Sequence, residues 1–112
     1  MATANFQTAL LRHDEWKAQW INSGIEADSV NGIVPHLRKT FEVKKPISSA
    51  TVFVTSRGLY EASLNGKRVG DAFLTPGWTS YNKHLQYQTY DVTKQLSTGK
   101  NAVGVTLGSG WY

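Results

Sequence analysis

Polar and apolar residues alternate with a period of two along much of the chain after position 35. In "HLRKTFEV" (36–43), Leu37, Phe41 and Val43 fall on one face, and polar side chains fill most of the other. Alternation of this kind is typical of a β-strand with one buried face. The pattern recurs downstream, so we expect further strands in three segments: "SATVFVTSR" (49–57), "LQYQTYDV" (85–92) and "NAVGVTLG" (101–108).

The dipeptide Asn65-Gly66 separates two more alternating runs. Both central residues of a type I′ turn need a positive φ, which Asn and Gly tolerate best. The sequence therefore predicts a tight β-hairpin at this point. On its first arm we expect three side chains to face inward: Tyr60, Ala62 and Leu64.

No segment shows a long helical period. "DVTKQLSTGK" (91–100) predicts one short helical turn, with Asp91 as its cap and Gly99 as its stop. These elements favour an all-β fold, an antiparallel β-sandwich of jelly-roll-like type. Such a sandwich usually needs about seven or eight strands, and this chain supplies fewer, so we expect it to be incomplete. We assign residues 1–34 to a lead-in and loop, and residues 35–112 to the sandwich module, truncated at its C-terminus.

Composition narrows the functional classes. The 112 residues carry a formal net charge of +4, but the 12 Lys and Arg are scattered. Scattered cations favour solvated strand faces over a nucleic-acid interface, because phosphate binding depends on clustering. With no cysteine, disulfides and thiolate metal sites are excluded. No apolar stretch approaches the ~20 residues of a membrane span. The first residues lack a signal-peptide pattern, and the compartment stays open.

The residues from Gly58 to Tyr112 carry a family resemblance. In order, they contain G-x-Y-E, an N-G hairpin, G-D, P-G-W-T-x-Y, Y-Q-T-Y-D-V-T, G-x-N-A and G-x-G-W-Y. This series resembles the N-terminal β-sandwich region of bacterial α-L-rhamnosidases, glycoside hydrolase family 78. Upstream, "WKAQWI" and "LRKTFEVKKPISSATVFVTSRG" are similar to its lead-in strands. The resemblance covers roughly residues 6 to 112.

The resemblance implies a role within a larger enzyme. In that family the module continues past G-W-Y with further strands, and an (α/α)₆ barrel that follows carries the catalytic carboxylates. We therefore expect this chain to be a non-catalytic fragment. It would support the barrel or help to recognise terminal L-rhamnosides. An alternative is a self-standing L-rhamnose-binding module. We also expect contact with the remaining domains of the parent enzyme, or self-association through exposed strand edges.

The ionisable residues do not indicate catalysis within the chain. Glycoside hydrolysis needs two carboxylates about 5 Å or about 6.5–9.5 Å apart, and no pair here has a spacing that demands such a site. The carboxylates are Asp14, Glu15, Glu26, Asp28, Glu42, Glu61, Asp71 and Asp91. The three histidines, His13, His36 and His84, share no metal-ligand spacing.

Sugar binding is the better-supported chemistry. In "PGWTSYN" (76–82), Trp78 and Tyr81 supply aromatic faces, and Asn82 supplies polar groups for sugar hydroxyls. We therefore take Asp71, at the start of this connection, with Trp78, Tyr81 and Asn82 as candidate substrate-binding residues. The competing interpretation is that the two aromatics plug a core or a domain interface. Some rhamnosidase sandwiches bind rhamnose through calcium, and the resemblance implies Asp71 as one partial ligand of that ion.

Overall fold

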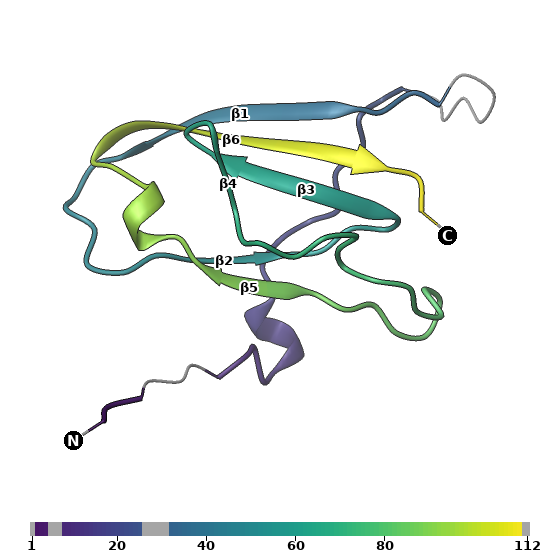
Figure 1. Ribbon diagram of the computed structural model, residues 1–112, viewed down its shortest axis with the longest axis horizontal. Helices are drawn as coiled ribbons and strands as arrows, with labels where there is room; N and C mark the ends of the chain where they lie inside the picture. The colour runs from purple at the N-terminus through teal and green to yellow at the C-terminus, as the bar shows by residue number, and fades with distance from the viewer. Residues whose placement is uncertain (1, 5–7, 26–31, 111–112) are drawn as a thin grey trace.

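The computed structural model describes residues 2–4, 8–25 and 32–110, and within them the protein is all-β. Six strands in this part form two antiparallel sheets that face each other, which confirms the predicted sandwich class (Figure 1). The elements in chain order are η1 (His13–Glu15), β1 (His36–Val43), β2 (Thr51–Val54), β3 (Leu59–Leu64), β4 (Lys67–Arg68), β5 (Gln88–Asp91), η2 (Thr93–Gln95) and β6 (Gly99–Gly108).

The larger sheet has the strand order β1-β6-β3-β4, and the smaller pairs β2 with β5. Strand β6 lies between β1 and β3, so that Val105 is opposite Leu37 on one side and Ala62 on the other. These three residues share the inner face because side chains alternate along each strand. Strand β6 is thus paired along both edges, and its apolar side chains Val103, Val105 and Leu107 pack against the core.

The predicted hairpin is confirmed. Asn65 and Gly66 have φ values of 51° and 80° and join β3 to β4. The Asn65 side chain also donates to Gln95 O (2.8 Å) and to Asn101 Oδ1 (2.9 Å), and it accepts the amide of Ala102 (2.9 Å). The Asn65 side chain therefore links the hairpin turn to the start of β6.

The core lies between β3 and the smaller sheet. The buried apolar residues are Tyr60, Ala62, Leu64, Val69 and Val92, which confirms the three inward positions predicted for the first hairpin arm. The Tyr60 hydroxyl donates to Gln88 Oε1 (2.7 Å) and so joins the two sheets. Burial raises the pKa of Tyr60 well above its usual value.

Two short turns of helix accompany the strands in the described residues, and one differs from expectation. Asp91 Oδ1 accepts the Thr93 amide (3.0 Å) and hydroxyl (2.6 Å), but the N-cap position is Val92. These bonds from Thr93 lower the pKa of Asp91. The prediction that Gly99 stops the turn is wrong, because the helical residues end at Gln95 and Gly99 begins β6.

The lead-in segment packs against the outer side of the smaller sheet (Figure 1). The Leu10 amide donates to the Tyr87 hydroxyl (2.9 Å), and the Trp16 ring lies 5.4 Å from the Tyr87 ring. Close by, the Arg12 guanidinium lowers the pKa of Asp14. The division at residues 34 and 35 stays a prediction, although these contacts attach the lead-in to the sandwich.

Three further expectations bear on the ends and edges of the fold. Strands β1 and β4 are the outer strands of the larger sheet, and each strand of the smaller sheet has one partner. Self-association through these edges stays a prediction. Trp111 and Tyr112, the last residues of the family motif, lie outside the described residues. No helix in the described part is both long and apolar enough to span a membrane.

Candidate functional site

All four candidate binding residues lie in the long connection between β4 and β5. This connection extends beyond one end of the sandwich, the end at which β3 begins (Figure 1). Its first half is fixed to β3, because the Tyr60 amide donates to Thr75 O (2.9 Å) and the Thr75 hydroxyl donates to Tyr60 O (3.0 Å). Leu74, just before this bridge, has a φ of 57°, which is uncommon for a residue with a side chain.

Arg68 holds the start of the connection. Its guanidinium donates to Ala72 O (2.5 Å) and lies 4.3 Å from the centre of the Phe73 ring. Glu61 Oε2 is 3.7 Å from Arg68 Nε, which is close enough for an ion pair but too long for a hydrogen bond. These contacts attach the start of the connection to the edge of the larger sheet.

The second half of the connection forms an open hollow with the link between β2 and β3. Residues 78–83 and Arg57 line the hollow, whose volume is about 440 Å³. The loop is braced internally: Ser80 O accepts the amides of Lys83 (2.8 Å) and His84 (2.9 Å), and the Thr79 hydroxyl donates to His84 O (2.6 Å). The hollow is therefore built on a hydrogen-bonded turn.

The structure brings three of the four candidates together. Trp78, Tyr81 and Asn82 all line the hollow, and the Trp78 side chain is 74% exposed. A ring this exposed is not covered by the described part of the sandwich. The interpretation of the two aromatics as plugs of a core or a domain interface stays a prediction. Tyr81 is half-buried, with its hydroxyl 3.4 Å from Gly77 O. Asp71 is exposed and lies outside the lining of this hollow.

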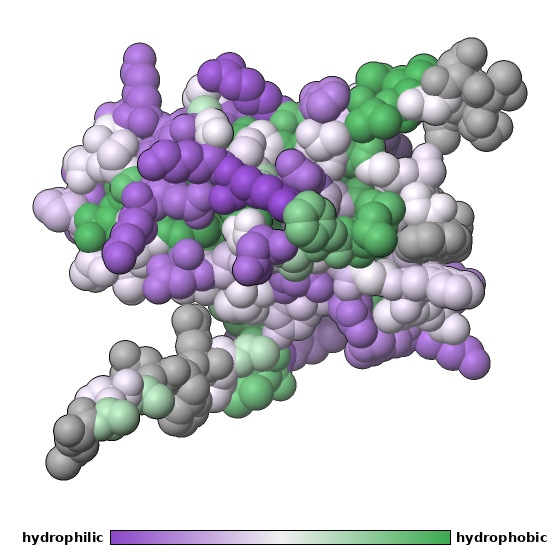
Figure 2. Space-filling model, viewed as in Figure 1, coloured by the Kyte–Doolittle hydropathy of each residue, from purple (hydrophilic) through white to green (hydrophobic). Residues whose placement is uncertain are grey.

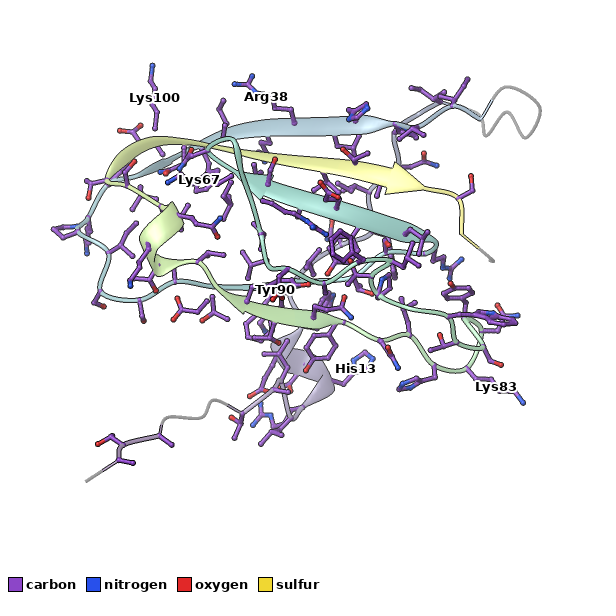
Figure 3. All side chains as sticks on the ribbon, viewed as in Figure 1. His13, Arg38, Lys67, Lys83, Tyr90 and Lys100 are labelled. Atoms are coloured by element: carbon purple, nitrogen blue, oxygen red, sulfur yellow. The ribbon has the colours of Figure 1, made fainter. Side chains whose placement is uncertain are left out.

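Four lining residues were not among the candidates from the sequence: Arg57, Thr79, Ser80 and Lys83. Arg57 and Lys83 place cationic side chains at the hollow. The Arg57 guanidinium also lies over the ring of Trp20, 5.6 Å from its centre. Figure 3 shows Lys83 at the outer end of the β4–β5 connection. Arg57 is 21 positions before Trp78, and no short-range pattern links an arginine in one loop to an aromatic in another.

The acidic groups of the described residues do not cluster as metal ligands do. Within the residues described, no group of three or more His, Asp or Glu side chains could hold a metal ion. Calcium prefers six to eight oxygen ligands, and Asp71 alone does not supply them. The assignment of Asp71 as a partial calcium ligand stays a prediction. His36 is instead engaged with the Thr106 hydroxyl, 3.0 Å away.

Two large apolar side chains of the β4–β5 connection are exposed at this end of the molecule. Figure 2 shows one group of apolar side chains at the centre right and others at the upper right and the left, whereas the lower right, where the β4–β5 connection reaches its tip, is pale to hydrophilic. Phe73 and Leu74 in that connection are 77% and 64% exposed. Exposed apolar groups of this size are suited to contact with another surface.

The two antiparallel sheets and the hollow place the chain in the class of small β-sandwich modules that carry aromatic and polar side chains at one end. Residues 45–112 match the α-L-rhamnosidase N-terminal domain family, and the chain belongs to that family. This match confirms the resemblance inferred from the motifs.

Individual relatives agree with the family match. An α-L-rhamnosidase of Formosa agariphila is 34% identical to the chain over 115 residues, which cover 96% of the chain and 12% of the relative. The crystal structure of the α-L-rhamnosidase of Streptomyces avermitilis complexed with L-rhamnose matches with a TM-score of 0.69 and 48% identity, over 72% of this chain and 8% of that one. The native Aspergillus terreus α-L-rhamnosidase matches with a TM-score of 0.68 and 49% identity, over 70% and 9% of the two chains. The chain thus spans about a tenth of the length of these relatives.

Proposed function

We propose that this chain is a non-catalytic β-sandwich portion of an α-L-rhamnosidase and that its hollow helps to recognise terminal L-rhamnosides. Hydrolysis would take place in a separate catalytic domain of the parent enzyme. The observation that carries this proposal is the exposure of Trp78 in a hollow that Tyr81 and Asn82 also line. Membership of the family supports it, because the matched relatives are α-L-rhamnosidases.

The chemistry of the hollow suits a sugar ring. The C–H groups of a pyranose form an apolar face that packs on an aromatic ring, and an exposed indole offers the largest such surface. Side chains that hydrogen-bond to hydroxyl groups lie beside it, namely those of Thr79, Ser80 and Asn82. A site with an apolar platform and a few convergent polar groups is the usual arrangement for a small polar ligand.

The same lining is unsuited to cleavage of the glycosidic bond. Both known geometries of glycoside hydrolysis place two carboxylates on either side of that bond. None of the residues that line the hollow is an aspartate or a glutamate. The hollow therefore binds without supplying an acid or a nucleophile.

Support of neighbouring domains is the second candidate function. The exposed side chains of Phe73 and Leu74 favour it, since they would be covered by a domain packed against the β4–β5 connection. The two functions are compatible, because these two residues do not line the hollow.

A calorimetric titration with methyl α-L-rhamnoside tests recognition. We expect Trp78→Ala to weaken binding about tenfold, the effect of losing about 1.4 kcal/mol of ring contact. Phe73→Ala is the matched control, because it removes another exposed aromatic ring from the same connection but from outside the hollow. Equal affinities of the two variants would refute the proposed site. Repeating the titration with EDTA tests calcium: binding that requires the ion would support the role predicted for Asp71, and unchanged binding would refute it.

A further inference from the structure

The hollow carries two cationic side chains and no anionic one. Arg57 and Lys83 both line it, and its other lining residues are neutral. From this one-sided charge we propose that the hollow binds a saccharide residue that bears an anionic group, a carboxylate or a sulfate, in preference to a neutral one. This inference rests on the proposed function, because it names the class of sugar that the same hollow takes.

Arg57 is the residue that would contact the anion. Its guanidinium lies over the Trp20 ring, 5.6 Å from the ring centre, which is within the range of a cation–π contact. A guanidinium carries five N–H donors, and a contact with one ring does not occupy all of them. An arginine fork fits a carboxylate or a sulfate with two parallel hydrogen bonds. Trp20 therefore contacts Arg57 without neutralising its charge.

Within the described residues, neither cation is paired with a carboxylate. The two ion pairs in the described residues are Arg12–Asp14 and Arg68–Glu61, and neither includes Arg57 or Lys83. Arg57 is also exposed, so its charge faces solvent at the hollow. A cation that already had an acidic partner would gain little from a second anion, and the described residues supply no such partner to these two cations.

Arg57 and Lys83 contribute differently to the binding of an anionic sugar. Arg57 comes from the link between β2 and β3, and it meets the loop of Trp78 at the hollow. Figure 3 shows Lys83 extending outward from the tip of the β4–β5 connection. Its charge acts over a longer distance and raises the local concentration of anions rather than fixing their orientation. The preference for an anionic sugar thus depends mainly on Arg57.

General attraction by the net charge of the protein must be separated from this specific effect. The chain carries a formal charge of +4, so any anion is weakly attracted. Figure 3 places Arg38 on the larger sheet, well away from the β4–β5 connection that carries Lys83. Arg38→Gln removes the same unit of charge as Arg57→Gln, and it leaves the hollow intact.

The experiment compares three sugars with one ring scaffold: D-glucose, D-glucuronate and D-glucose 6-sulfate, each titrated at physiological ionic strength. We expect at least one of the two anionic sugars to bind about tenfold more tightly than glucose, the effect of one charge-assisted hydrogen-bonded contact. Comparing D-glucuronate with D-glucose 6-sulfate shows whether the hollow prefers a carboxylate or a sulfate. Arg57→Gln is expected to reduce the ratio of anionic to neutral affinity nearly to one, and Arg38→Gln to preserve it.

Each outcome decides between the two proposals. Equal affinity for the three sugars would overturn the preference for an anion and leave the proposed rhamnoside recognition standing. A preference that survives Arg57→Gln, or that Arg38→Gln removes equally, would overturn the role of Arg57. If methyl α-L-rhamnoside and all three sugars fail to bind, both proposals fall. Unfolding curves that match those of the unchanged protein would show that each variant is folded.

Discussion

Gly58 sets the position of Arg57, and its replacement is the sharpest structural test of the site. Gly58 has a φ of 86° and starts the turn into β3. A Cβ atom at this position would lie 2.4 Å from Gly108 O and 2.6 Å from Ser109 O. Both obstacles are backbone atoms at the end of β6, so neither can rotate away. Gly58→Ala must therefore move the turn, the end of β6, or both.

Gly66 provides a matched comparison. Its φ is 80°, close to that of Gly58, but a Cβ atom there would meet nothing within 4 Å. Gly66→Ala therefore carries only the cost of a side chain in the left-handed region, about 1–2 kcal/mol. Gly58→Ala carries that cost and about 1–3 kcal/mol more for the steric overlap, about 2–5 kcal/mol in all. Small domains are marginally stable, so the larger loss approaches their whole stability.

Urea unfolding followed by tryptophan fluorescence measures this difference. We expect the midpoint to fall for both variants and to fall clearly further for Gly58→Ala, to the point where its cooperative transition is lost. The unchanged protein and Gly66→Ala should share one m-value, since neither alters the surface exposed on unfolding. Equal losses of stability for the two variants would refute the reasoning, because the packing of Gly58 against the end of β6 would then contribute nothing.

Two further predictions concern ionisation. Hydrogen bonds from Thr93 lower the pKa of Asp91 below its ordinary value of 3.8. The ionised carboxylate therefore stabilises the fold above pH 3.8, and we expect this stabilisation to be lost as the pH falls through the lowered pKa. Urea midpoints measured from neutral to acidic pH should fall, and Asp91→Asn should flatten that fall; an unaltered pH profile would contradict the assignment. Because burial raises the pKa of Tyr60, its contribution is complete below the ordinary value of 10.0 and is lost as the pH rises further. Tyr60→Phe should cost about 1 kcal/mol by removing the bond to Gln88 and should weaken the alkaline loss of stability; a variant as stable as the parent would show that this bond is dispensable.

Local patterns in the chain were sufficient to predict most of the strands. The alternation around Phe41 placed β1, and the Asn65-Gly66 pair placed the hairpin, because each signal depends on residues that are neighbours in sequence. The error at Gly99 has the same origin. A glycine with a positive φ is typical of the end of a helix, but here that φ, 98°, occurs at the first residue of β6. The pairing of β6 with β1 decided the outcome.

Local patterns did not predict the hydrogen bonds that hold the hairpin against β6. Asn101 is 2% exposed, and its amide group bonds to Asn65 and to Ser97. A buried amide in a strand has to be satisfied, because an unpaired polar group is costly in the interior. The sequence shows a polar residue on the apolar face of β6 but does not show its partners.

The sequence by itself determined an all-β module of the α-L-rhamnosidase N-terminal family and placed the aromatic residues of the β4–β5 connection as candidates for sugar binding. Only the tertiary structure decided that Trp78 is exposed, that Asp71 is not among the residues lining the hollow, and that Arg57 is. The physical reason is the range of the interactions. Strand alternation and turn formation are encoded by residues a few positions apart, whereas a binding surface forms where loops from different strands meet at one end of the sandwich.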